Sequence, residues 1–87
     1  MRPTRYNYVE NDPTLRRFIE REFQSLQSVE ILLSTDSPSE ALQSEALARA
    51  DAALLDLALG ASEINGIDLG LAMRERNPDI GNVVYSQ

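Results

Sequence analysis

The chain of 87 residues contains no cysteine, no histidine and no lysine, and its eight cationic side chains are all arginine. Without cysteine, disulfide bonds and thiolate metal sites are excluded. No apolar run approaches the roughly 20 residues that a membrane-spanning helix needs. The N-terminal stretch, residues 1–8, lacks the apolar core of a secretory signal. We therefore expect no membrane contact and a cytoplasmic location.

Positive charge is scarce, and the formal net charge is −6. A nucleic-acid surface depends on clustered cations that bind phosphate, so we expect no nucleic-acid partner. Arg16, Arg17 and Arg21 do cluster. They fall among Glu20 and Glu22 on one expected helix, which favours a solvated helix face over a phosphate-binding surface.

Composition indicates an ordinary folded domain, with 43% apolar and 25% charged residues. No repeat, low-complexity tract or linker divides the sequence. We expect residues 1–87 to form one small domain, near the lower size limit for a single core.

Alternating short apolar runs and amphipathic stretches predict an α/β fold. The Asp12-Pro13 pair marks a helix start, because an acidic N-cap followed by proline is a common opening. Asn77-Pro78 marks a helix end. The expected strands are residues 5–9, 29–34, 52–56 and 83–85; the expected helices cover about 13–26, 41–48 and 69–76, with a loop at 60–66. The order βαβαβαβ, with short connections, predicts a parallel sheet.

Acidic residues follow two of these expected strands. Glu10, Asn11 and Asp12 come after the first, and Asp56 ends the third. The carboxyl ends of parallel strands form the usual ligand crevice of an open α/β sheet. Clustered carboxylates there either hold a divalent cation or shift each other's proton affinity. Asp56 alone could be a simple strand terminator, and Asp12 is better interpreted as the cap of the helix that begins at Pro13.

Five segments together carry a family resemblance: Val9–Pro13, Asp51–Asp56, Asn65–Leu69, Arg74–Ile80 and Val83–Ser86. In this order and spacing, the chain resembles the response-regulator receiver domain of two-component signalling. The resemblance runs over essentially all 87 residues. It implies a three-layer, flavodoxin-like (CheY-like) parallel sheet that lacks the family's usual last helix, strand and helix.

The resemblance also implies a role for individual residues. The resemblance makes Asp56 both the phosphoacceptor aspartate and a ligand of Mg²⁺, and Glu10 and Asn11 match the acidic pair that binds the metal. Ala58 would offer its backbone carbonyl to the metal. Ser86 matches the hydroxyl residue that hydrogen-bonds the phosphoryl group. The implied partner is a histidine kinase or a phosphotransfer protein. A hard cation with oxygen ligands suits this chemistry, because it offsets repulsion between a carboxylate and an anionic donor.

Several positions depart from the family pattern. Asn11 replaces an aspartate, which should weaken Mg²⁺ binding. Gly60 stands where a proline is usual, and Gln87 replaces a small residue after the hydroxyl position. The family's last strand carries a lysine that pairs with the phosphoryl group, whereas this chain has none. If the chain is complete, we expect poor phosphorylation or none.

Loss of the last helix, strand and helix would leave an exposed final strand and an uncovered face of the first helix. We therefore expect a homodimer through either surface. The leading hypothesis is a signalling receiver, not an enzyme. The alternative is a degenerate receiver that acts as a dimerisation or protein-interaction module. A metal-dependent hydrolase is disfavoured, because Ala58 breaks an Asp-x-Asp pair and no histidine offers a general base. Nucleotide binding is disfavoured because no glycine-rich loop follows the first strand.

Overall fold

The structure is a computed structural model, and it describes residues 2–59 and 64–86. The elements follow one another as β1 (Thr4–Val9), α1 (Pro13–Gln24), β2 (Val29–Thr35), α2 (Pro38–Gln43), α3 (Ala46–Arg49), β3 (Ala52–Asp56), α4 (Gly66–Arg76) and β4 (Gly81–Tyr85). No helix within the described ranges is both long and apolar enough to cross a bilayer.

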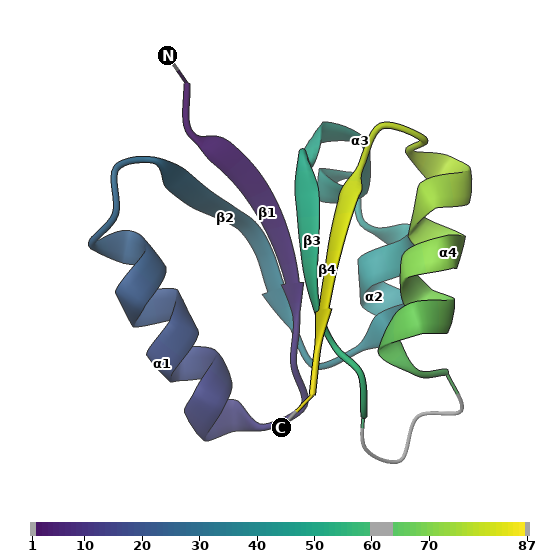
Figure 1. Cartoon of the computed structure of the whole chain (residues 1–87), viewed down its shortest axis with the longest axis horizontal. Helices are drawn as coiled ribbons and strands as arrows, with labels where there is room; N and C mark the ends of the chain where they lie inside the picture. Colours follow the sequence, from purple (N-terminus) through teal and green to yellow (C-terminus); the bar gives the residue numbers. More distant parts are fainter. Residues whose placement is uncertain (1, 60–63, 87) are drawn as a thin grey trace.

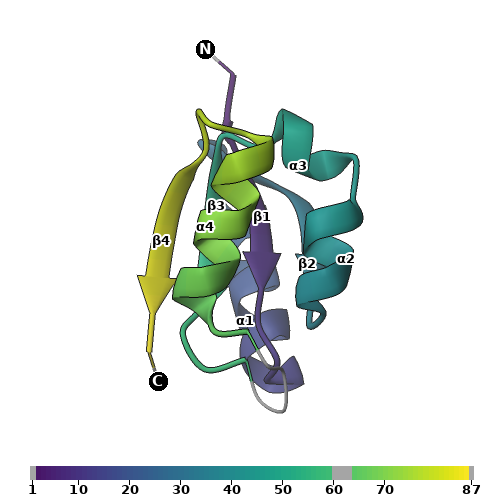
Figure 2. The same ribbon diagram turned by 90° about the vertical axis from the view of Figure 1, so that its right-hand side faces the viewer.

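The four strands form one parallel sheet in the order β2-β1-β3-β4. Helix α1 lies on one face of the sheet, and α2, α3 and α4 lie on the other (Figures 1 and 2). This is the predicted three-layer α/β fold with a flavodoxin-like parallel sheet. Strands β1 and β3 are central, so their carboxyl ends lie side by side, as the acidic cluster requires.

Among the described residues, the main cluster of buried apolar side chains lies on the face that α2, α3 and α4 cover. It consists of small and branched apolar side chains: Val9, Ala41, Leu47, Ala50, Ala53, Leu55, Leu59, Leu69, Met73 and Ile80. Leu69 and Met73 of the expected 69–76 helix are fully buried. Helix α1, in contrast, has no buried residue, and Phe18 on it is 56% exposed. The α1 face of the sheet is therefore only partly covered.

The segment predicted as one helix over 41–48 is two short helices, α2 and α3. The prediction was wrong at Ser44, whose backbone is extended (φ −73°, ψ 141°). Its hydroxyl accepts a hydrogen bond from the Ala46 backbone N–H at 3.1 Å. Serine offers the backbone this alternative to a helical bond, which the apolar spacing of Leu42 and Leu47 does not reveal. Helix α1 also ends at Gln24, two residues before the predicted end.

Strand β1 contains a buried polar residue that fits the core poorly. Asn7 is fully buried, and neither its amide oxygen nor its amide nitrogen has a hydrogen-bond partner among the described residues. The register of β1 against β2 shifts between Tyr6 and Asn7. An unpaired buried amide destabilises a fold by about 1–3 kcal/mol.

Candidate functional site

The predicted acidic residues meet at the carboxyl edge of the sheet. Val9 pairs with Leu55 across β1 and β3, so Glu10 and Asp56 each come next along adjacent parallel strands. The structure buries both carboxylates, with exposed fractions of 0% for Glu10 and 1% for Asp56. Buried carboxylates require hydrogen-bond donors or a cation nearby, because desolvation disfavours their charge.

Asn11 joins these two residues. Its side-chain amide faces three oxygen atoms: Asp56 Oδ2 at 3.0 Å, Glu10 Oε2 at 3.2 Å and the Ala58 carbonyl at 3.3 Å. With its nitrogen on this side, Asn11 donates hydrogen bonds to these acceptors. With its oxygen on this side, that oxygen lies 3.0–3.3 Å from the other three. The four residues proposed as metal ligands from the sequence thus lie together, although their role as ligands stays a prediction.

The spacing of these atoms suits a small divalent cation. Magnesium–oxygen bonds are about 2.1 Å long in octahedral geometry, so neighbouring ligand oxygens lie about 3 Å apart. The contacts of the Asn11 amide, at 3.0–3.3 Å, have this spacing. No group of three or more histidine, cysteine, aspartate or glutamate side chains gathers at a metal position within residues 2–59 and 64–86. The donor set therefore fits Mg²⁺ only when the Asn11 and Ala58 oxygens join the two carboxylates.

The turn after β3 holds Asp56 in place. The Ala58 backbone N–H donates to Asp56 Oδ1 at 3.1 Å. The Leu57 N–H donates to the Tyr85 carbonyl at 2.7 Å, and the Gly66 N–H donates to the Leu57 carbonyl at 3.0 Å. These bonds connect the end of β3 to β4 on one side and to the start of α4 on the other.

Gly66, predicted to lie at the end of a loop, instead begins α4 and approaches the backbone of Asp56 closely. A Cβ atom on this residue would lie 2.4 Å from the Asp56 carbonyl oxygen and 3.0 Å from Leu57 Cα. Only glycine therefore lets the first turn of α4 pack directly against the backbone that carries Asp56. Asn65 caps the helix, since its Oδ1 accepts from the Asp68 N–H at 2.9 Å.

Glu10 is held from several directions. Its Oε2 accepts the Asp12 backbone N–H at 2.9 Å, and its Oε1 accepts the hydroxyl proton of Tyr85. Arg16 Nη1 donates to the Glu10 backbone carbonyl at 3.1 Å. Arg16, predicted to belong to a solvated helix face, instead contacts the site. Asp12 is confirmed as the cap of α1, with its Oδ1 accepting from Thr14 N at 2.9 Å.

Tyr85 is a functional candidate that the sequence reasoning missed. The sequence offered only its place directly before Ser86, at the end of the expected strand; the structure adds its register with Asp56. Its hydroxyl also lies 3.3 Å from the Tyr8 hydroxyl. Burial raises the pKa of Tyr85 far above its usual value, and the hydrogen bond to Glu10 adds to the rise. Burial likewise raises the pKa of Tyr8, so both phenols stay protonated at neutral pH.

Ser86, predicted to hydrogen-bond a phosphoryl group, follows β4 one position beyond the Asp56–Tyr85 pair. It is exposed and borders an apolar hollow of about 390 Å³ formed with Leu15, Ile19, Leu54 and Tyr85. Its role stays a prediction. The substitutions noted at Gly60 and Gln87 lie outside the described residues.

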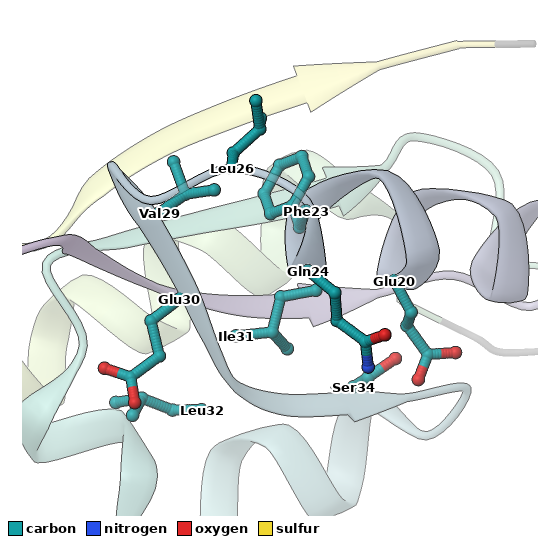
Figure 3. A pocket seen from close by; sticks show the side chains of 9 residues that line it. All are labelled: Glu20, Phe23, Gln24, Leu26, Val29, Glu30, Ile31, Leu32 and Ser34. Atoms are coloured by element: carbon teal, nitrogen blue, oxygen red, sulfur yellow. The ribbon is translucent and has the colours of Figure 1, made fainter.

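A separate groove of about 510 Å³ runs between the end of α1 and the edge strand β2 (Figure 3). Phe23, Leu26, Val29 and Ile31 provide apolar walls, while Glu20, Gln24, Glu30 and Ser34 contribute polar atoms. None of the lining residues belongs to the acidic cluster. The groove therefore lies along the β2 edge of the sheet, apart from the acidic cluster.

Solved structures with the same fold were found by comparison of coordinates. The RcsB response regulator of Salmonella typhimurium has a TM-score of 0.81 at 15% identity, over 99% of this chain and 43% of RcsB. The MaeR response regulator bound to beryllium trifluoride has a TM-score of 0.73 at 20% identity, over 95% of this chain and 66% of MaeR. The chain has the fold of response-regulator receiver domains. It spans less than half the length of RcsB. Neither the family models nor the curated proteins give a significant match.

Proposed function

We propose that this receiver-fold chain is a phosphoacceptor of two-component signalling, with Asp56 as the acceptor and Mg²⁺ as the cofactor. The observation that carries the proposal is the close approach of Asp56, Glu10 and the Ala58 carbonyl to the Asn11 amide at the carboxyl edge of the sheet. The fold shared with MaeR, whose structure holds beryllium trifluoride, supports the same site. A histidine kinase or a phosphotransfer protein would supply the phosphoryl group.

The proposed reaction needs little more than placement of one carboxylate. An Asp56 oxygen attacks the phosphorus of the donor, a new P–O bond forms, and the bond from phosphorus to the leaving group breaks. The Ala58 N–H bonded to Oδ1 fixes the orientation of the attacking group. Glu10, Asn11, Asp56 and the Ala58 carbonyl would hold Mg²⁺, which would neutralise the charge on the phosphoryl oxygens. Positioning and charge neutralisation dominate the catalysis of phosphoryl transfer.

Intact mass spectrometry tests this proposal directly. The chain is incubated with acetyl phosphate, with and without Mg²⁺, beside Asp56→Asn and Asp79→Asn variants. We expect the added mass of one phosphoryl group only with Mg²⁺, in the parent chain and Asp79→Asn but not in Asp56→Asn. Asp79 is an exposed aspartate in the turn before β4, so it controls for the general loss of a carboxylate. An adduct that survives in Asp56→Asn would refute the assignment of the acceptor.

A second candidate function is a phosphorylation-independent contact module, and the β4 edge favours it. Gly81–Tyr85 contains no charged residue, and Val83 and Val84 are 49% and 37% exposed. Exposed apolar edge strands without charge are templates for pairing with another strand. Asn11 in place of an aspartate points the same way. Persistent absence of an adduct under all conditions would favour this function.

We propose a homodimer through this β4 edge or through the exposed face of α1. The net charge of −6 opposes association of two copies, so the contact should use the uncharged surface around Val83. Sedimentation of the parent chain and of a Val83→Lys variant tests the idea. We expect a concentration-dependent dimer for the parent and a monomer for the variant. A parent chain that stays a folded monomer at micromolar concentration would contradict it.

A further inference from the structure

Glu10 is bound at each of its carboxylate oxygens by a different part of the chain. Its Oε2 accepts the Asp12 N–H at 2.9 Å and faces the Asn11 amide at 3.2 Å. Its Oε1 is turned the other way and accepts the hydroxyl proton of Tyr85. In this fully buried carboxylate, Oε2 therefore faces the candidate cation position, and Oε1 binds a residue of β4.

Tyr85 is suited to fix this orientation. A phenol hydroxyl donates to a carboxylate, and hydrogen bonds to charged acceptors are the strong ones. The backbone of Tyr85 is fixed as well, since its carbonyl accepts the Leu57 N–H at 2.7 Å, one residue after Asp56. The ring thus stands on the strand that pairs with β3 and reaches back across the sheet edge to β1.

We propose that Tyr85 is a positioning residue for the candidate site: its hydroxyl holds Glu10 Oε1 so that Oε2 faces Asn11 and Asp56. The expected effect on cation affinity rests on the proposed function, whereas the orientation of Glu10 does not. The orientation of Glu10 is a property of the chain itself. Removal of a group that hydrogen-bonds a metal ligand and fixes its orientation typically lowers metal affinity by about 10- to 100-fold.

Tyr85→Phe removes the hydroxyl and keeps the ring in its half-buried place. The matched control is Tyr6→Phe, because Tyr6 stands on β1 and packs its ring against Phe23 at a centroid distance of 5.5 Å. The first readout needs no cation: amide hydrogen exchange and the ¹⁵N–¹H shift of Asp12, whose N–H is bound to Glu10 Oε2. The second readout is Mn²⁺ and Mg²⁺ affinity by calorimetry.

We expect Tyr85→Phe to move the Asp12 resonance, speed its exchange and weaken cation binding by about 10-fold or more. Tyr6→Phe should do none of these. A purely structural role would lower the melting temperature and leave both readouts unchanged. An unchanged Asp12 amide in Tyr85→Phe overturns the inference. If the parent binds no cation, the proposed function fails, and the Asp12 amide still decides whether Tyr85 positions Glu10.

Discussion

Replacement of Gly66 by alanine tests how closely the first turn of α4 packs against the backbone of Asp56. The added Cβ would lie 2.4 Å from the Asp56 carbonyl oxygen, whereas real Cβ atoms essentially never approach within 3.0 Å. The carbonyl must therefore retreat by at least 0.6 Å or α4 must lift away. The neighbouring atoms are backbone, including Leu57 Cα at 3.0 Å, so no side chain can rotate to make room.

The energetic effect follows from two opposed terms. Overpacking of a tight contact destabilises a domain by about 1–3 kcal/mol. Alanine is a better helix former than glycine by up to about 1 kcal/mol, and less at the first helical position. We expect Gly66→Ala to lower the free energy of unfolding by about 1–2 kcal/mol, and the melting temperature by roughly 4–8 °C per kcal/mol. Divalent-cation affinity should fall too, since Asp56 moves with its backbone.

Urea denaturation, thermal melting and calorimetry measure these effects together. Gly81→Ala is the matched control, because the nearest atom to its Cβ would be the Asp51 carbonyl at an ordinary 3.8 Å. A Gly66→Ala protein as stable as the parent, with unchanged cation affinity, would refute the close approach of α4 to Asp56. A loss of stability in Gly81→Ala of the same size would refute the explanation by contact.

Asn7→Leu should raise the free energy of unfolding by about 1–3 kcal/mol in urea denaturation, since it removes a buried amide without a partner; a loss of stability would contradict this. The Arg5 N–H, and then the Arg2 side chain, lower the pKa of Asp51 from 3.8. Asp51 thus stabilises the fold above that pH, and the stability difference between the parent and Asp51→Asn should shrink as pH falls below it; a pH-independent difference would count against the contact. Asn11→Asp should bind Mg²⁺ more tightly in calorimetry, because it adds a negative charge to the site; weaker binding would argue against a direct ligand.

The sequence predicted the sheet well because its strands leave strong local signals. The continuous apolar run at residues 52–56 lies in a central strand of the sheet, and Asp12-Pro13 opens α1 as expected. The convergence of Glu10 and Asp56 followed from parallel topology alone. The break between α2 and α3 was not predictable from periodicity, because a single serine side chain at position 44 decides it.

Contacts between segments far apart in sequence were beyond the reach of sequence patterns. Tyr85 reads as an ordinary strand residue, and only its pairing with Asp56 brings its hydroxyl to Glu10, 75 positions earlier. The Asn65-Gly66 pair is also a common turn signal, so the sequence does not show that Gly66 begins a helix. Its closeness to the Asp56 backbone depends on how α4 docks, which no local pattern encodes.

Titration of the ¹⁵N-labelled chain with Mg²⁺ tests most directly whether the acidic edge binds a cation. We predict that the largest shift changes fall on the backbone amides of Asn11, Asp56 and Ala58, and that Asp56→Asn abolishes them. Changes centred on other residues, or a spectrum that does not respond to Mg²⁺, would contradict the site.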